Sequence, residues 1–154
     1  MLEIRQFVVH ESCLNCLGCC RYNLPSNIWL PQLLEEEKGL LNIERLETIP
    51  HNDGYICFFL NPEDNRCQVY ERRPLECRIY PFIINRQGKK LFLGIDIKCP
   101  AVSDKIKSEQ FREHRDYLIE YFKSPLGLTA LRNNRRVFCS YPADEILNLT
   151  ELII

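Results

Sequence analysis

This sequence has no excess of charge of one sign and no long apolar run. Lysine plus arginine number 20 against 21 aspartate plus glutamate, which leaves a formal net charge of −1. No stretch approaches the roughly 20 apolar residues of a membrane-spanning helix. The first ten residues are too short and too often charged for a signal peptide. We therefore expect no membrane partner and no nucleic-acid partner, and we expect the protein in the cytoplasm.

The motifs of several common enzyme classes are also missing. The chain has 6 glycines among its 154 residues, and they form no nucleotide-binding loop. It has no Ser-His-Asp order and no C-x3-C-x2-C motif for radical initiation. The residues by themselves therefore support an enzyme less than a metal-binding or interaction protein, and whether the chain catalyses a reaction stays open.

Cysteine, by contrast, is abundant, with nine copies in the chain. Four of them, Cys13, Cys16, Cys19 and Cys20, lie within eight residues in the sequence C-L-N-C-L-G-C-C. Thiolates three residues apart can turn toward one point, as a soft metal ion or an iron–sulfur cluster requires. Disulfides are the alternative, but a reducing cytosol and an odd number of cysteines favour metal ligands.

The remaining cysteines extend this run into a longer pattern. A lone cysteine comes next, then the segment C-x-V-Y-x-x-R-P-x-x-C-R-x-Y-P-F, and finally a C-P pair. From Cys13 to Pro100 the chain resembles the YkgJ-like cysteine-cluster family, the zinc- or iron-chelating CxxCxxCC proteins. Flagellin lysine methylases carry a similar cluster, where the resemblance implies iron and sulfide, but this chain lacks their additional length. The ligands that we predict for the metal are Cys13, Cys16, Cys19, Cys20, Cys57, Cys67, Cys77 and Cys99.

Eight thiolates leave the identity of the metal open. They suit two structural zinc ions with four ligands each, and they equally suit one or two [4Fe–4S] clusters. Three cysteines at spacings of three residues favour a cluster, because they can share one cubane. We predict an iron–sulfur cluster, with zinc as the alternative. Cys19 and Cys20 are neighbours whose side chains diverge, so they can serve different sites.

Four further residues of the motif are predicted to surround the metal. A metal–thiolate centre is anionic, so Arg73 and Arg78 would offset its charge and donate hydrogen bonds to its sulfur atoms. The alternative is that both arginines are ordinary surface or helix-capping residues. Tyr70 and Tyr80 are expected to pack around the site and exclude water. Cys139, in the sequence V-F-C-S-Y, is expected to act as a small buried hydrophobe.

The hydrophobic pattern predicts an α+β fold, a small cysteine-rich domain with a short antiparallel sheet, irregular loops and C-terminal helices. Helices are expected over residues 28–41, 74–80 and 103–123, with a weaker helical pattern over 144–154. Strands are expected over 43–50, 55–60, 82–85 and 90–97, the last two as a hairpin. We expect a single domain, in which a metal-binding core (1–100) carries a helical extension (101–154).

Three functional classes follow from this sequence. The first is a metalloprotein whose cluster does redox or electron-transfer work or serves a protein-modification system, with a protein or redox partner. The second is a zinc-stabilised structural or interaction module with two four-cysteine sites and no catalysis. The third is a modification enzyme, which rests on family analogy and not on named residues. Nothing in the sequence predicts the oligomeric state.

Overall fold

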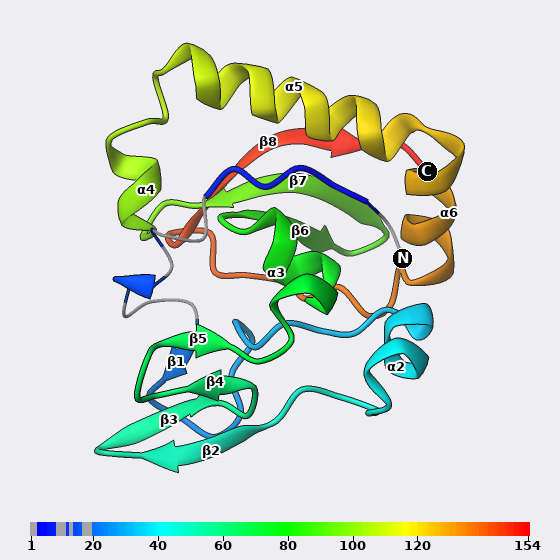
Figure 1. Ribbon diagram of the computed structural model, residues 1–154. Coiled ribbons are helices and arrows are strands. Elements are labelled where there is room, and N and C mark those ends of the chain that lie inside the picture. The colour runs from blue at the N-terminus through cyan, green and yellow to red at the C-terminus, as the bar shows by residue number, and fades with distance from the viewer. Residues whose placement is uncertain (1–2, 9–11, 13, 17–19) are drawn as a thin grey trace.

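The computed structural model describes residues 3–8, 12, 14–16 and 20–154, and its fold is α+β as predicted (Figure 1). The described helices are α2 (Glu35–Leu41), α3 (Leu75–Ile79), α4 (Pro100–Ser103), α5 (Glu109–Lys123) and α6 (Pro125–Asn133), with a 3-10 turn η1 (Tyr70–Arg72). The strands are β1 (Arg21–Tyr22), β2 (Thr48–His51), β3 (Gly54–Cys57), β4 (Leu60–Asn61), β5 (Arg66–Cys67), β6 (Phe82–Gln87), β7 (Lys90–Asp96) and β8 (Ile146–Leu152). No helix in these described ranges is long and apolar enough to cross a membrane.

Three small antiparallel sheets organise the chain. Strands β1, β3 and β2 pair in that order, β4 pairs with β5, and β6, β7 and β8 form a third sheet. Figure 1 shows the first two sheets together in the lower part of the molecule and the third in the upper part, with α5 running along it. The described N-terminal arm (residues 3–8) also crosses the upper part, beside the third sheet.

Two separate hydrophobic cores correspond to these two parts. The large core lies between the third sheet and the helices α3, α5 and α6, and its fully buried members include Phe82, Leu93, Leu118 and Phe122. The small core belongs to the lower part and contains Tyr22, Leu33, Leu46 and Val69. Burial of apolar side chains stabilises each part, and the junction between the two cores is where the candidate site lies.

Two of the predicted elements are confirmed because their signals are local. Helix α3 begins directly after Pro74, whose fixed φ suits a helix start, and it ends at Ile79, before Pro81. The hairpin of β6 and β7 pairs Gln87 with Lys90 across a two-residue turn. Gly88 in this turn has φ +61°, a conformation that glycine adopts without strain.

The tail prediction is wrong. Residues 144–154 do not form a helix, because Ile146–Leu152 is strand β8, which pairs with β7 along its length. An edge of the third sheet offers unpaired backbone groups to this segment, and Ile146 and Leu152 become buried there. Tertiary pairing therefore overrides the helical pattern, and the C-terminal extension contributes helices and a strand.

Two helix starts and two strands were also predicted wrongly, and the strand expected over 43–50 begins only at Thr48. The first helix begins at Glu35 and not near residue 28, because Pro31 lacks an amide hydrogen and Gln32 N donates to Glu76 Oε2 at 2.7 Å. The long helix α5 begins after Ser108, whose side chain caps Phe111 N at 3.1 Å, and not at Ser103. The strand expected over 55–60 ends at Cys57, and a turn separates it from β4.

Candidate metal centre

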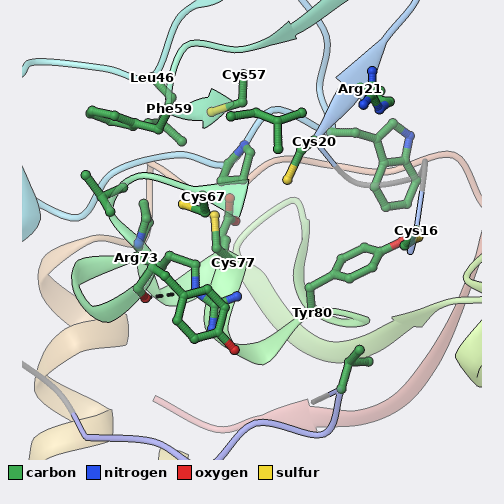
Figure 2. A pocket seen from close by; sticks show the side chains of 18 of the residues that line it. Cys16, Cys20, Arg21, Leu46, Cys57, Phe59, Cys67, Arg73, Cys77 and Tyr80 are labelled. Carbon is green, nitrogen blue, oxygen red and sulfur yellow. Dashed lines mark hydrogen bonds between the residues drawn. The ribbon is translucent and has the colours of Figure 1, made fainter. Parts of the chain in front are cut away.

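A cavity of about 130 Å³ lies at the junction of the two cores, and five thiols of the described residues line it. They belong to Cys16, Cys20, Cys57, Cys67 and Cys77. In Figure 2 the sulfur atoms of four of these residues face the same space, while Cys16 lies apart from them near Tyr80. Residues far apart in the sequence therefore bring soft donor atoms to one place.

The strand ladders position three of these thiols. Cys57 N donates to Cys20 O at 2.9 Å, which continues the pairing of β3 with β1. Cys67 ends β5 and pairs with Leu60 at the start of β4, just after the turn that follows Cys57. Short strands with tight turns thus place Cys20, Cys57 and Cys67 around one end of the lower part of the molecule.

Helix α3 brings the fourth thiol, Cys77, from the other side. Its neighbours Leu75 and Ile79 are fully buried in the large core. Cys57 and Cys67 instead pack against the small core. A metal bound by these thiols would therefore connect the two cores.

Electrostatic effects between the thiols divide them into two sets. The pKa of Cys57 is raised to about 11, mainly by burial and also by the neighbouring Cys20 and Cys67. Burial also raises the pKa of Cys77 strongly, with Cys20, Cys57 and Cys67 acting in the same direction. We call Cys20, Cys57, Cys67 and Cys77 the four-thiol set.

Cys99 belongs to the second set. It is buried beside α4, and its pKa is raised mainly by burial and also by Asp96 and by Cys16. The two remaining predicted ligands, Cys13 and Cys19, lie outside the described residues. Among the described thiols, Cys16 therefore lines the same cavity as the four-thiol set and also influences the pKa of Cys99.

The chemistry of the four-thiol set suits a soft metal. Cys57, Cys67 and Cys77 have raised pKa values, so these thiols stay protonated when no cation is near, because neighbouring thiolates repel one another and lose hydration. A thiophilic metal ion or an iron–sulfur cluster stabilises the thiolates and displaces their protons. The residues therefore fit such a group.

The same side chains do not converge on a single point. In the described residues, no group of three or more His, Cys, Asp and Glu side chains is placed to hold one metal ion. Ligand sulfurs of a tetrahedral zinc ion lie about 3.8 Å apart, given Zn–S bonds of about 2.3 Å. The thiols instead border a cavity.

Arg73, which the sequence suggested as a charge-compensating residue, lies beside this cavity. It is 8% exposed, lines the cavity and lowers the pKa of Cys67 and of Cys77 through its charge. Its Cζ lies 3.7 Å from the ring centroid of Tyr70, and its Nε donates to Tyr70 O at 3.0 Å. Tyr70 also lines the cavity. Figure 2 shows Arg73 near Cys67 and Cys77.

Arg78 and Tyr80 are placed differently from each other. Arg78 is buried but does not line the cavity, and its Nη2 lies 3.7 Å from Glu37 Oε1. Tyr80 does line the cavity, and its hydroxyl donates to Asp96 Oδ2 at 2.8 Å. Tyr80 therefore lies at the cavity with the thiols, whereas Arg78 pairs with Glu37 away from the cavity lining.

The sequence interpretation missed Glu76, which precedes Cys77 and lines the same cavity. One carboxylate oxygen accepts from Gln32 N, and the other has no hydrogen-bond partner among the described residues. Burial raises the pKa of Glu76 to about 7. In the sequence, Glu76 was marked only as a charged residue inside a short predicted helix.

Cys139 does not line the cavity and is half-buried. Its carbonyl accepts from Arg86 N at 2.9 Å at the edge of β6.

Comparison with known proteins agrees with the cysteine pattern. A 44-residue segment, 29% of the chain, is 39% identical to "Uncharacterized protein MJ0661" of Methanocaldococcus jannaschii and covers 24% of that protein's length. No solved structure matches the chain. The family "CxxCxxCC: Putative zinc- or iron-chelating domain" matches residues 12–124, which extends past Pro100 to include α5. The chain therefore belongs to this family of cysteine-cluster, metal-chelating domains.

Proposed function

We propose that the protein holds an iron–sulfur cluster, most simply [4Fe–4S], through Cys20, Cys57, Cys67 and Cys77. The observation that carries this proposal is the cavity of about 130 Å³ that all four thiols line. Four cysteine thiolates are the usual ligand set of such a cluster.

The spacing of the thiols supports a cluster over a zinc ion. A cluster contains several metal and sulfide atoms, so its thiolates lie around a volume and do not meet at one atom. The described side chains have that character, since they line a cavity and no three of them are grouped for a single ion. A two-zinc structural module is the alternative outcome of the experiment below.

We extend the proposal to a second centre that uses Cys16 and Cys99 with Cys13 and Cys19. The electrostatic link between Cys16 and Cys99 supports this grouping. The proposal of two centres assigns Cys19 and Cys20 to different centres. This suits adjacent residues, because their side chains usually diverge. Eight cysteines then divide into four and four.

An iron–sulfur cluster supplies one-electron redox chemistry when bound. We therefore propose redox or electron-transfer work, done with a protein partner. The chain's own contribution is to hold the thiols, to place the Arg73 charge beside them and to exclude water with Tyr70 and Tyr80.

Anaerobic purification of the full chain, followed by iron, sulfide and zinc analysis and visible absorption, tests the proposal. We expect a brown protein with broad visible absorption and equal amounts of iron and acid-labile sulfide. A colourless protein that carries zinc would overturn the cluster proposal in favour of the structural module. A protein with neither metal would overturn both.

A further inference from the structure

The N-terminal arm is fastened to the upper part of the molecule on both sides of Gln6. The backbone amide of Arg5 donates to the hydroxyl of Tyr117 at 3.0 Å, and its guanidinium lies 4.1 Å from the centroid of that ring. The Phe7 ring contacts Phe82 edge-on, with centroids 5.8 Å apart. These contacts fix the backbone on either side of Gln6, whose side chain lines the cysteine cavity.

The carbonyl of the Gln6 side chain accepts two hydrogen bonds. One comes from Arg73 Nη2 and the other from the Tyr70 hydroxyl at 3.2 Å. Tyr70 also holds Arg73 through its ring and its backbone carbonyl. Gln6 and Tyr70 therefore hold the Arg73 guanidinium together, from two segments far apart in the sequence.

We infer that Gln6 is a positioning residue for the metal centre, because it holds the Arg73 guanidinium beside Cys67 and Cys77. This inference rests on the proposed function. A neutral acceptor fixes the guanidinium without cancelling its charge, so the full positive charge stays available to the thiolates. A carboxylate at the same place would hold Arg73 equally well but would neutralise it.

Comparing the wild type with Gln6→Leu and Gln6→Glu therefore distinguishes an electrostatic role of Gln6 from a purely structural one. Gln6→Leu removes the acceptor and releases the guanidinium. Gln6→Glu keeps an acceptor of nearly the same shape and cancels the charge. A purely structural role for the arm predicts that Gln6→Glu behaves like the wild type, whereas the positioning role predicts that both variants weaken metal retention.

The experiment uses the metal-loaded full chain and measures the rate at which metal passes to an excess of a colorimetric chelator. We expect loss about tenfold faster for Gln6→Leu, as is usual for residues that support metal ligands, and clearly faster loss for Gln6→Glu. Gln87→Leu is the matched control, since Gln87 is exposed at the end of β6 and does not line the cavity. Thermal unfolding of each variant checks that the fold is retained.

A double substitution tests whether Gln6 acts through Arg73. In Arg73→Met the substitution Gln6→Leu should have no further effect on the rate of metal loss, because the group that it positions is gone. If Arg73→Met does not fold, Arg73→Lys replaces it, since lysine lacks the planar fork that reaches Gln6.

Three results would overturn the inference. The first is that Gln6→Leu loses metal at the wild-type rate, and the second is that Gln6→Glu does so. The third is that Gln6→Leu still accelerates metal loss in full when Arg73 is replaced. Each leaves the proposed function intact, because the wild type still binds metal. A wild-type protein without metal would instead overturn the proposed function, and this inference with it.

Discussion

The carboxylate of Glu37 accepts a hydrogen bond from the backbone amide of Leu75 at 2.6 Å. Its other oxygen accepts from Leu34 N at 3.0 Å, and Arg78 Nη2 lies 3.7 Å from the first oxygen. One buried side chain thus joins the start of α2 to the start of α3. Because α3 carries Cys77, Glu37 holds one wall of the cysteine cavity.

Replacing Glu37 should therefore destabilise the protein strongly. Glu37→Ala leaves the Arg78 charge and two backbone amides without this buried partner, and we expect a loss of about 3–5 kcal/mol in the free energy of unfolding. Chemical denaturation measures it. Glu35→Ala is the control, because the pair of Glu35 with Lys38 is exposed and should contribute little to the stability. Equal effects of the two substitutions would contradict the role given to Glu37.

Single cysteine substitutions should separate ligands from the ninth cysteine. Cys77→Ser should lose metal and loosen the junction of the two cores, because Cys77 lines the cavity. Cys16→Ser should also reduce the metal content, by removing a ligand of the second set. Cys139→Ser should leave the metal content unchanged. Metal analysis of the three purified variants checks this, and equal losses in all three would show that the ligand set was drawn too narrowly.

His114 should make stability depend on pH. It is buried against Phe7 and Phe82, and burial, with a smaller effect of the Arg5 charge, lowers its pKa to about 4. The unfolded chain then binds a proton between about pH 6.5 and pH 4 that the folded chain does not. The contribution of His114 to the free energy of unfolding should fall over that window as pH decreases, by about 2 kcal/mol after allowance for solvent screening.

The comparison for this pH dependence is His114→Phe, which keeps an aromatic ring in the same surroundings. Its free energy of unfolding, measured by urea denaturation across the same pH range, should lack that contribution. If the free energy of unfolding depends on pH in the same way in the wild type and in His114→Phe, His114 is not the source of the pH dependence.

Gly127 should not tolerate a side chain. A Cβ there would lie 2.2 Å from Tyr121 O and 2.7 Å from Phe122 Cα, so the joint between α5 and α6 would have to open. We expect Gly127→Ala to cost more than about 2 kcal/mol, as severe overpacking does. Gly39→Ala is the control, since nothing lies within 4 Å of its Cβ position on α2, and it should stabilise by up to about 1 kcal/mol. Differential scanning calorimetry of both variants would detect the opposite signs.

The local elements of this protein were predictable because their signals lie within a few residues. Pro74 and Pro81 delimit α3, and the glycine turn after Gln87 sets the register of β6 and β7. The start of α5 was predicted five residues too early, because Ser103 and Ser108 both resemble helix caps. Only the packing of α4 against the large core, with Val102 buried in it, decides between them.

The candidate site was predictable only in part. The cysteine spacing and Arg73 belong to one recognisable motif, so the sequence alone singled them out. Gln6 lies 67 positions from Arg73, and no local pattern connects them. Glu76 was overlooked because a glutamate in a short helix is usually solvated, whereas here it lines a buried cavity.

The sequence by itself determined that this protein offers many thiols in a family pattern and that soft-metal chemistry is the use that suits them. The tertiary structure decided which of the described thiols meet, since Cys16, Cys20, Cys57, Cys67 and Cys77 come from distant segments and line one cavity. It also placed β8 beside β7, against the helical pattern of the tail. The physical reason is that spacing along a chain limits only nearby residues, whereas strand pairing and the burial of two cores bring distant ones together.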